Sequence, residues 1–159
     1  MKLNRIVFLL FIVTFGFSAQ VDIEKASAIS KNFFESRTGQ VYSVNSTQVI
    51  SETENPLLYV FILNPTGFII VSANDAAMPV LGYSFENDFR EDDLPIQLEW
   101  MFEQYKDEIQ DMYSENSTAT NEIRALWRLY SDDFDYEQAR SVSPLLSCNW
   151  DQGSSWNDM

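Results

Sequence analysis

The fold of this chain is decided by one stretch, Leu57-Leu58-Tyr59-Val60-Phe61-Ile62-Leu63, then Asn64-Pro65-Thr66-Gly67, then Phe68-Ile69-Ile70-Val71-Ser72-Ala73. Its two outer parts are rich in β-branched and aromatic residues, which favour strands. Its middle part places proline second and glycine last, the order typical of a type I turn. The stretch therefore predicts a β-hairpin. Because both strands are apolar along their length, the hairpin should lie at the centre of an antiparallel sheet.

Strands and helices are predicted on both sides of the hairpin. Residues 41–50 mix β-branched and polar side chains and predict one strand, and residues 79–83 predict a short returning strand after a turn at 74–77. Residues 21–37, 95–113 and 122–130 repeat apolar side chains at steps of three and four, which predicts three helices. Gly39 should end the first helix. The predicted fold class is α+β, an antiparallel β-sheet with a central hairpin packed against flanking helices.

The composition excludes several classes of function. The chain of 159 residues has 24 acidic and 10 basic side chains, a formal net charge of −14, and 45% hydrophobic residues. The apolar fraction is too high for a disordered acidic chain, and the negative charge disfavours nucleic acid and anionic membranes as partners. The sequence contains no histidine and 1 cysteine, which excludes an imidazole base, an internal disulfide and a four-cysteine metal site. We therefore predict no cofactor and no metal.

The first nineteen residues read as a secretory signal peptide. Lys2 and Arg5 precede an apolar run over residues 6–17, and the small residues Ser18 and Ala19 follow. The run is shorter than the roughly 20 residues that span a bilayer, although a single membrane anchor is the alternative. Cleavage is expected between Ala19 and Gln20, or one residue earlier. The chain should then be secreted to the periplasm or the extracellular space, without membrane contact after removal of the signal.

Two later segments lack apolar periodicity. Residues 86–93 carry five acids and one arginine, which predicts a solvated loop before the helix that starts near Pro95. From Asp132 the sequence is acidic and irregular, and it ends with two tryptophans that have no predicted core of their own. We therefore expect residues 141–159 to be the truncated start of a further domain.

Three blocks of the sequence, taken in order, resemble the streptopain family of secreted bacterial cysteine proteases. They are Gly67-Phe68-Ile69-Ile70-Val71-Ser72-Ala73-Asn74-Asp75 with Pro79-Val80-Leu81-Gly82-Tyr83-Ser84, then Asp88-Phe89 with the helix through Trp100, Tyr105 and Ile109, and finally Val142-Ser143-Pro144-Leu145-Leu146 with Trp150-Asp151-Gln152 and Trp156-Asn157. The first two are similar to the prodomain, a Spi-type protease inhibitor domain, and the third to the start of the mature protease. In the third block Ser155 and Trp156 replace the proline and tyrosine that are usual there.

The resemblance implies that residues 20–140 form an inhibitory prodomain, which covers the active-site cleft of a streptopain-type cysteine endopeptidase until it is removed by proteolysis. The partner would be the cognate protease domain, in cis within a zymogen or in trans. A stand-alone secreted inhibitor of such a protease is the alternative, and an unrelated secreted binding module is a third possibility. The chain itself carries no catalytic residue: it has no histidine, and Cys148 lacks the sequence setting of the family's nucleophile.

The resemblance also points to two sets of site residues. The family's occluding loop corresponds to the segment before the long helix, so Asp92, Asp93, Leu94, Pro95 and Ile96 are the candidates for entering the protease cleft. Processing is expected at two bonds, Ala19-Gln20 for the signal and Arg140-Ser141 for the prodomain. Arg140 is the only basic residue in the segment 132–143, which should be open to proteases.

Overall fold

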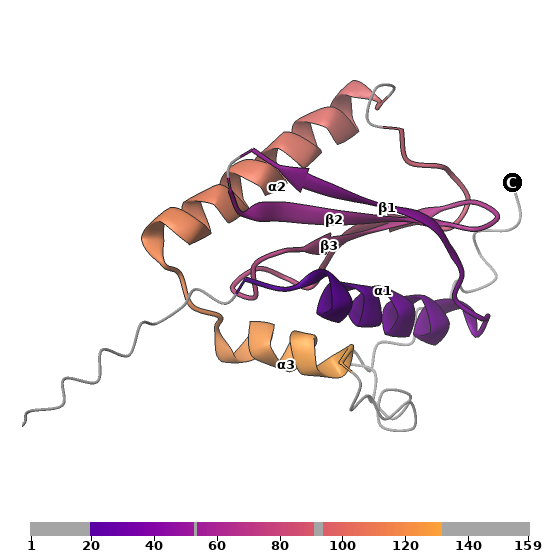
Figure 1. Ribbon diagram of the computed structural model, residues 1–159, viewed down its shortest axis with the longest axis horizontal. Helices are drawn as coiled ribbons and strands as arrows, with labels where there is room; N and C mark the ends of the chain where they lie inside the picture. Colours follow the sequence, from indigo (N-terminus) through magenta and orange to yellow (C-terminus); the bar gives the residue numbers. More distant parts are fainter. Residues whose placement is uncertain (1–19, 53, 91–93, 132–159) are drawn as a thin grey trace, which may run out of the picture.

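The computed structural model describes residues 20–52, 54–90 and 94–131. In these ranges the elements are α1 (Ile23–Thr38), β1 (Val44–Ser51), β2 (Pro56–Leu63), β3 (Phe68–Ser72), β4 (Val80–Ser84), α2 (Ile96–Glu115) and α3 (Asn121–Leu129). The strands form one antiparallel sheet in the order β1-β2-β3-β4, with α2 on one face and α1 and α3 on the other (Figure 1). The predicted α+β class and the central position of the hairpin are both confirmed.

Both faces of the central strands are buried, which explains why their sequences are apolar without alternation. Tyr59, Phe61 and Leu63 of β2 belong to the core cluster under α1 and α3. Leu58 and Val60 of the same strand belong to the cluster under α2, where Ile70 of β3 joins them. Successive side chains of a strand point to opposite faces, so one strand supplies two cores.

The connection between β2 and β3 differs from the predicted type I turn. Gly67 does not close such a turn with its N–H group, which instead donates to Asp88 Oδ1 at 3.3 Å. The hairpin is closed by the N–H of Leu63, which donates to the carbonyl of Gly67 at 2.9 Å. Gly67 has φ +108° and the Asn64–Pro65 peptide bond is cis. The end of β4 and the segment after it, both distant in sequence, therefore set the shape of this turn.

The helices begin and end at residues with recognisable capping roles. Asp22 caps α1 by accepting a hydrogen bond from the N–H of Lys25 at 2.7 Å, and Gly39 ends the helix in the left-handed conformation, as predicted. Thr120 caps α3 in the same way, accepting from the N–H of Ile123 at 3.2 Å. No described helix combines the length and the apolar character that a membrane span requires.

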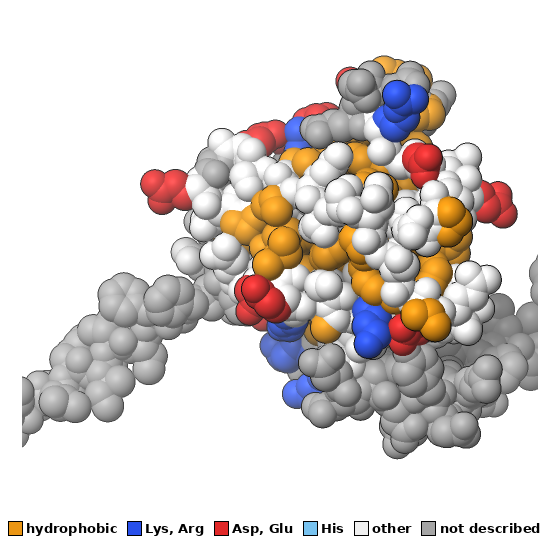
Figure 2. Space-filling view, turned by 45° about the vertical axis from the view of Figure 1, so that its right-hand side comes forward, with side chains coloured by type: hydrophobic (Ala, Val, Ile, Leu, Met, Phe, Trp, Pro, Cys, Tyr) orange, Lys and Arg blue, Asp and Glu red, His pale blue; other side chains and the backbone are white. Residues whose placement is uncertain are grey.

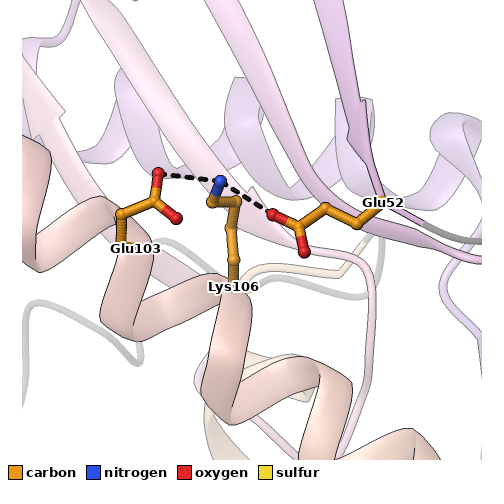
Figure 3. Close-up of polar contacts among 3 residues, drawn as sticks. All are labelled: Glu52, Glu103 and Lys106. Carbon is orange, nitrogen blue, oxygen red and sulfur yellow. Dashed lines mark ion pairs between the residues drawn. The ribbon is translucent and has the colours of Figure 1, made fainter.

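Hydrogen bonds and an ion-pair cluster fix α2 to the sheet. Tyr105 Oη donates to the carbonyl of Leu81 at 2.9 Å, and Tyr113 Oη donates to the carbonyl of Ala73 at 2.7 Å. Lys106 Nζ lies 2.9 Å from Glu52 Oε1, just after β1, and 2.8 Å from Glu103 Oε1 on the same helix (Figure 3). Burial opposes the charge on Lys106, but the hydrogen bonds to both carboxylates outweigh it and raise the pKa of the ammonium group.

Candidate functional site

The predicted site lies where the chain passes from β4 to α2. Asp92 and Asp93 fall outside the described residues, whereas Leu94, Pro95 and Ile96 are described and are called here the junction segment. Leu94 is partly buried against the α2-side core. Pro95 is the exposed N-cap residue of α2, and Ile96, the first residue of the helix, is 69% exposed.

The chain that leads from β4 toward the junction segment is anchored to the rest of the fold. Ser84 Oγ accepts hydrogen bonds from the N–H groups of Glu86 and Asn87 at 3.3 and 3.0 Å. Asp88 Oδ1 accepts from Thr66 Oγ1 at 2.8 Å, which ties this chain to the β2–β3 connection. Phe89 is then buried. These contacts hold the chain immediately before residues 91–93.

Phe89 and the start of α2 share one aromatic cluster. The ring of Phe89 lies 5.3 Å from that of Phe68 on β3 and 5.5 Å from that of Phe102 on α2, measured between centroids. Because Leu94 packs against the same core, a described residue on each side of 91–93 is held in place. The junction segment therefore begins at a residue that packs against the same core as Phe89.

A hollow of about 580 Å³ opens beside the junction segment, between β4 and the first turns of α2. It is called here the α2-side hollow. Its lining is mostly apolar and combines the first half of β3, the end of β4, the following chain and the helix: Phe68, Ile70, Gly82, Tyr83, Ser84, Asn87, Asp88, Phe89, Arg90, Leu94, Pro95, Leu98, Met101 and Phe102. Such a surface favours apolar and extended partners over highly charged ones.

Apolar side chains also reach the surface at the start of α2. Trp100 is 66% exposed and lies four residues after Ile96, so the two side chains share one face of the helix. The apolar repeat over residues 95–113 predicted one buried face, which Phe102 and Ile109 form. It gave Trp100 no surface role, and Leu98, which belongs to the same repeat, is 39% exposed. The available signal was that Trp100 lies off the repeat formed by Met101, Phe102 and Tyr105.

The perturbed titratable groups lie away from the junction segment and hold structure. Burial raises the pKa of the Asp75 carboxyl, although Lys25 and Arg124 pull it down. Burial also raises the pKa of Tyr59, whose Oη donates to the carbonyl of Val21 at 2.8 Å. Within the described ranges no group of three or more histidine, cysteine, aspartate or glutamate side chains is arranged to hold a metal ion. The exposed residues of the junction segment and the hollow beside them are suited to binding a partner.

Of the predicted processing residues, only Gln20 is described. Its backbone forms an isolated antiparallel bridge with Asn74, and the next residue, Val21, is buried with its N–H donating to the carbonyl of Ala73 at 2.8 Å. Ala19, Arg140 and Ser141 lie outside the described residues.

In Figure 2, hydrophobic side chains lie open on the face that is shown, and most of the acidic and basic side chains stand toward its margin.

A comparison with family models finds that the model described as Spi protease inhibitor matches residues 18–109. This is more than half of the chain. It includes the whole sheet, α1, the junction segment and most of α2, and it ends before α3. No curated protein and no solved structure matches the chain.

Proposed function

The chain belongs to the Spi protease inhibitor family, and we propose that the enzyme it inhibits is a secreted streptopain-type cysteine endopeptidase. Family membership makes the matched region a protease-inhibitor domain, and its partner is a protease. The streptopain type is supported by the sequence from Gly67 to Ser84, which resembles the prodomain of those enzymes. This sequence forms β3, β4 and the turn between them, so it lies directly beside the junction segment.

The proposal rests on one observation: the junction segment is packed against the core at its first residue and exposed at the next two. Leu94 packs against the core, while Pro95 and Ile96 are exposed at the start of a long helix. A segment that is held in place before binding loses little conformational entropy when it enters a cleft, so such a segment inhibits more tightly than a free one. We assign the cleft-occupying role to Leu94, Pro95 and Ile96, together with Asp92 and Asp93.

The inhibitor acts as a prodomain in this proposal. Covalent linkage to a protease domain gives an effective concentration in roughly the millimolar range, so moderate contacts keep the cleft occupied. Cleavage between Arg140 and Ser141 ends the linkage and releases residues 20–140. The same surface would serve a stand-alone inhibitor, which requires tighter contacts because it lacks this advantage.

Inhibition in trans tests the target and the site together. The purified chain should inhibit a streptopain-type cysteine protease and leave a chymotrypsin-type serine protease unaffected. Alanine at all five positions from Asp92 to Ile96 should raise the inhibition constant at least about tenfold, since a few central residues carry most of the binding energy of an interface. Val41→Ala, at a site that is 89% exposed and lies before β1, is the matched control. Unchanged inhibition by the five-residue variant would reject this site.

The prodomain role and the export of the chain are tested on the product of the full-length gene. Intact-mass and N-terminal analysis of protein from the culture medium should find a form beginning at Gln20 and a processed protease beginning at Ser141 or Val142. A form that begins at Gln20 and persists in the active enzyme would show that the domain is not removed. A reading frame that stops directly after codon 159 would favour the stand-alone inhibitor.

A further inference from the structure

The strand β4 is an edge of the sheet, and hollows adjoin it on both faces. In the described part of the chain it pairs only with β3. The α2-side hollow lies on one face. On the other lies a hollow of about 490 Å³, called here the α1-side hollow, which is lined by β4, by Phe33 and Arg37 of α1, and by Leu126 of α3 with Tyr130 after it. An edge strand with an apolar hollow on each face resembles the receptor sites of proteins that bind extended peptides.

Gly82 contributes to both hollows. A Cβ atom added there would meet only Ile70 Cδ1, at 3.6 Å, so a small side chain is sterically tolerated and a large one would extend toward the α2-side hollow. Beside Gly82, Tyr83 is 47% exposed, and Met78 before the strand is 52% exposed. The opposite edge strand, β1, instead exposes the polar side chains of Asn45, Ser46, Thr47 and Gln48.

We infer that an extended segment of the partner protease pairs with the outer edge of β4 as a fifth strand and places alternate side chains in the two hollows, while the Leu81 carbonyl keeps its hydrogen bond from Tyr105 Oη. This inference rests on the proposed function. Successive side chains of a strand point to opposite faces, so one added strand can fill both hollows at once. Backbone hydrogen bonds supply affinity, and the two hollows select uncharged, apolar side chains at alternate positions.

The position of β4 beside the junction segment favours the protease as the partner that pairs with this strand. Leu94 and Pro95 line the α2-side hollow together with Gly82 and Tyr83, so a protease that holds the junction segment in its cleft lies against β4. The net charge of −14 disfavours a second copy of the chain and steers a basic surface toward this one. The docking segment is therefore expected to lack acidic side chains.

The test compares the full chain with Gly82→Leu, which places a large side chain toward the α2-side hollow, and with one control. Gln48→Leu adds the same side chain to the other edge strand. With a purified streptopain-type protease domain, Gly82→Leu should raise the inhibition constant by about tenfold or more, as expected for a blocked interface pocket. Gln48→Leu should stay within about twofold. Thermal melting of each variant shows whether the fold is kept.

Hydrogen exchange on the unsubstituted chain gives a second readout that does not depend on the folding of a variant. Binding of the protease should slow amide exchange in residues 80–84 and leave residues 44–51 of β1 unchanged. If the chain inhibits but the β4 amides are not protected, or folded Gly82→Leu inhibits as well as the parent, edge docking is wrong and the proposed function stands. If the unsubstituted chain does not inhibit the protease, the proposed function is wrong and so is the choice of this protease as the partner of β4.

Discussion

Gly67 stands where the backbone of β4 leaves no room for a side chain. A Cβ atom at this position would lie 2.6 Å from the carbonyl oxygen of Ser84 and 3.0 Å from the Cα atom of Phe85. Gly39 at the end of α1 also has positive φ, +66°, but an added Cβ atom there meets nothing within 4 Å. Gly67 therefore combines crowding with a less favourable backbone conformation (φ +108°), whereas Gly39 carries the conformational cost alone.

Gly67→Ala should therefore be the more damaging of two matched substitutions. We expect Gly39→Ala to lower the free energy of unfolding by about 1 kcal/mol, the usual cost of a left-handed conformation without glycine. Gly67→Ala should lower it by about 3 kcal/mol or more, because the end of β4 must move as well. Urea denaturation followed by circular dichroism measures both. Equal losses would show that the close approach to Ser84 is not a constraint.

Ile70 tests the burial of the central strand pair. It is 4% exposed on β3 and belongs to the α2-side core. Ile70→Asp would place a carboxylate there without a partner, and the cost of its desolvation should abolish the cooperative thermal transition. Val49→Asp on β1, at a position that is 50% exposed, should melt close to the parent. A cooperative melt of Ile70→Asp near the parent temperature would contradict the placement.

At the scale of elements, the helices could be predicted because a local pattern of apolar residues marks each of them. The spacing of Ile29 and Phe33 with Gly39 beyond them predicted α1, and the apolar repeat after Pro95 predicted α2, because one buried face is enough to mark a helix. The type of the β2–β3 turn could not be predicted. Its shape depends on Asp88 and on the end of β4, which are distant in sequence.

The helix α3 lies beyond the region that matches the inhibitor family, yet it is integrated into the core. Trp127 is 6% exposed, and its Nε1 donates to the carbonyl of Ala77 at 2.9 Å, beside the start of β4. Asn32 of α1 donates through Nδ2 to the carbonyls of Tyr130 and Ser131, at 3.1 and 3.0 Å. α3 therefore supports the side of the sheet on which the α1-side hollow opens.

Trp127→Ala should consequently destabilise the whole domain. The loss of a buried aromatic side chain is expected to cost about 3–5 kcal/mol in the free energy of unfolding. Leu129→Ala, two residues later on the same helix and 36% exposed, should cost less than about 1 kcal/mol. Urea denaturation of the two variants makes the comparison. A small loss for Trp127→Ala would mean that the sheet and the other helices fold independently of α3.

At the scale of the whole molecule, two partly buried phenols predict how stability depends on pH. Burial raises the pKa of Tyr42 and that of Tyr113 from 10.0 to about 12. Because the folded state holds these protons more tightly than the unfolded state, their contribution is complete below pH 10 and is lost between about pH 10 and 12. Melting temperatures should fall across this window. Tyr113→Phe should make the melting temperature fall less steeply with pH. If it falls as steeply as in the unsubstituted chain, the phenol of Tyr113 is not a cause of the pH dependence.

The candidate site was predictable only in part, because it depends on the tertiary arrangement. The acidic run before Pro95 marked a break between sheet and helix, and the resemblance pointed to the same place. The hollows beside β4 could not be derived from the sequence, because Gly82 and Tyr83 form them with side chains of all three helices. The exposure of Trp100 is a different case, because its position off the apolar repeat of α2 already placed it outside the buried face.

The order of the strands has a consequence for how the domain is made. Among the described residues, every strand of the sheet pairs with its neighbour along the chain, so each of these pairings closes a short loop and none waits for a distant strand. A chain that emerges N-terminus first can therefore add β1, β2, β3 and β4 in the order of their appearance, and α2 can then cover the finished sheet. The α1-side hollow also needs Leu126 of α3 and Tyr130 after it. We therefore expect the surface beside β4 to be complete once α3 has emerged, so that any protease region emerging later would meet an inhibitor that is already folded.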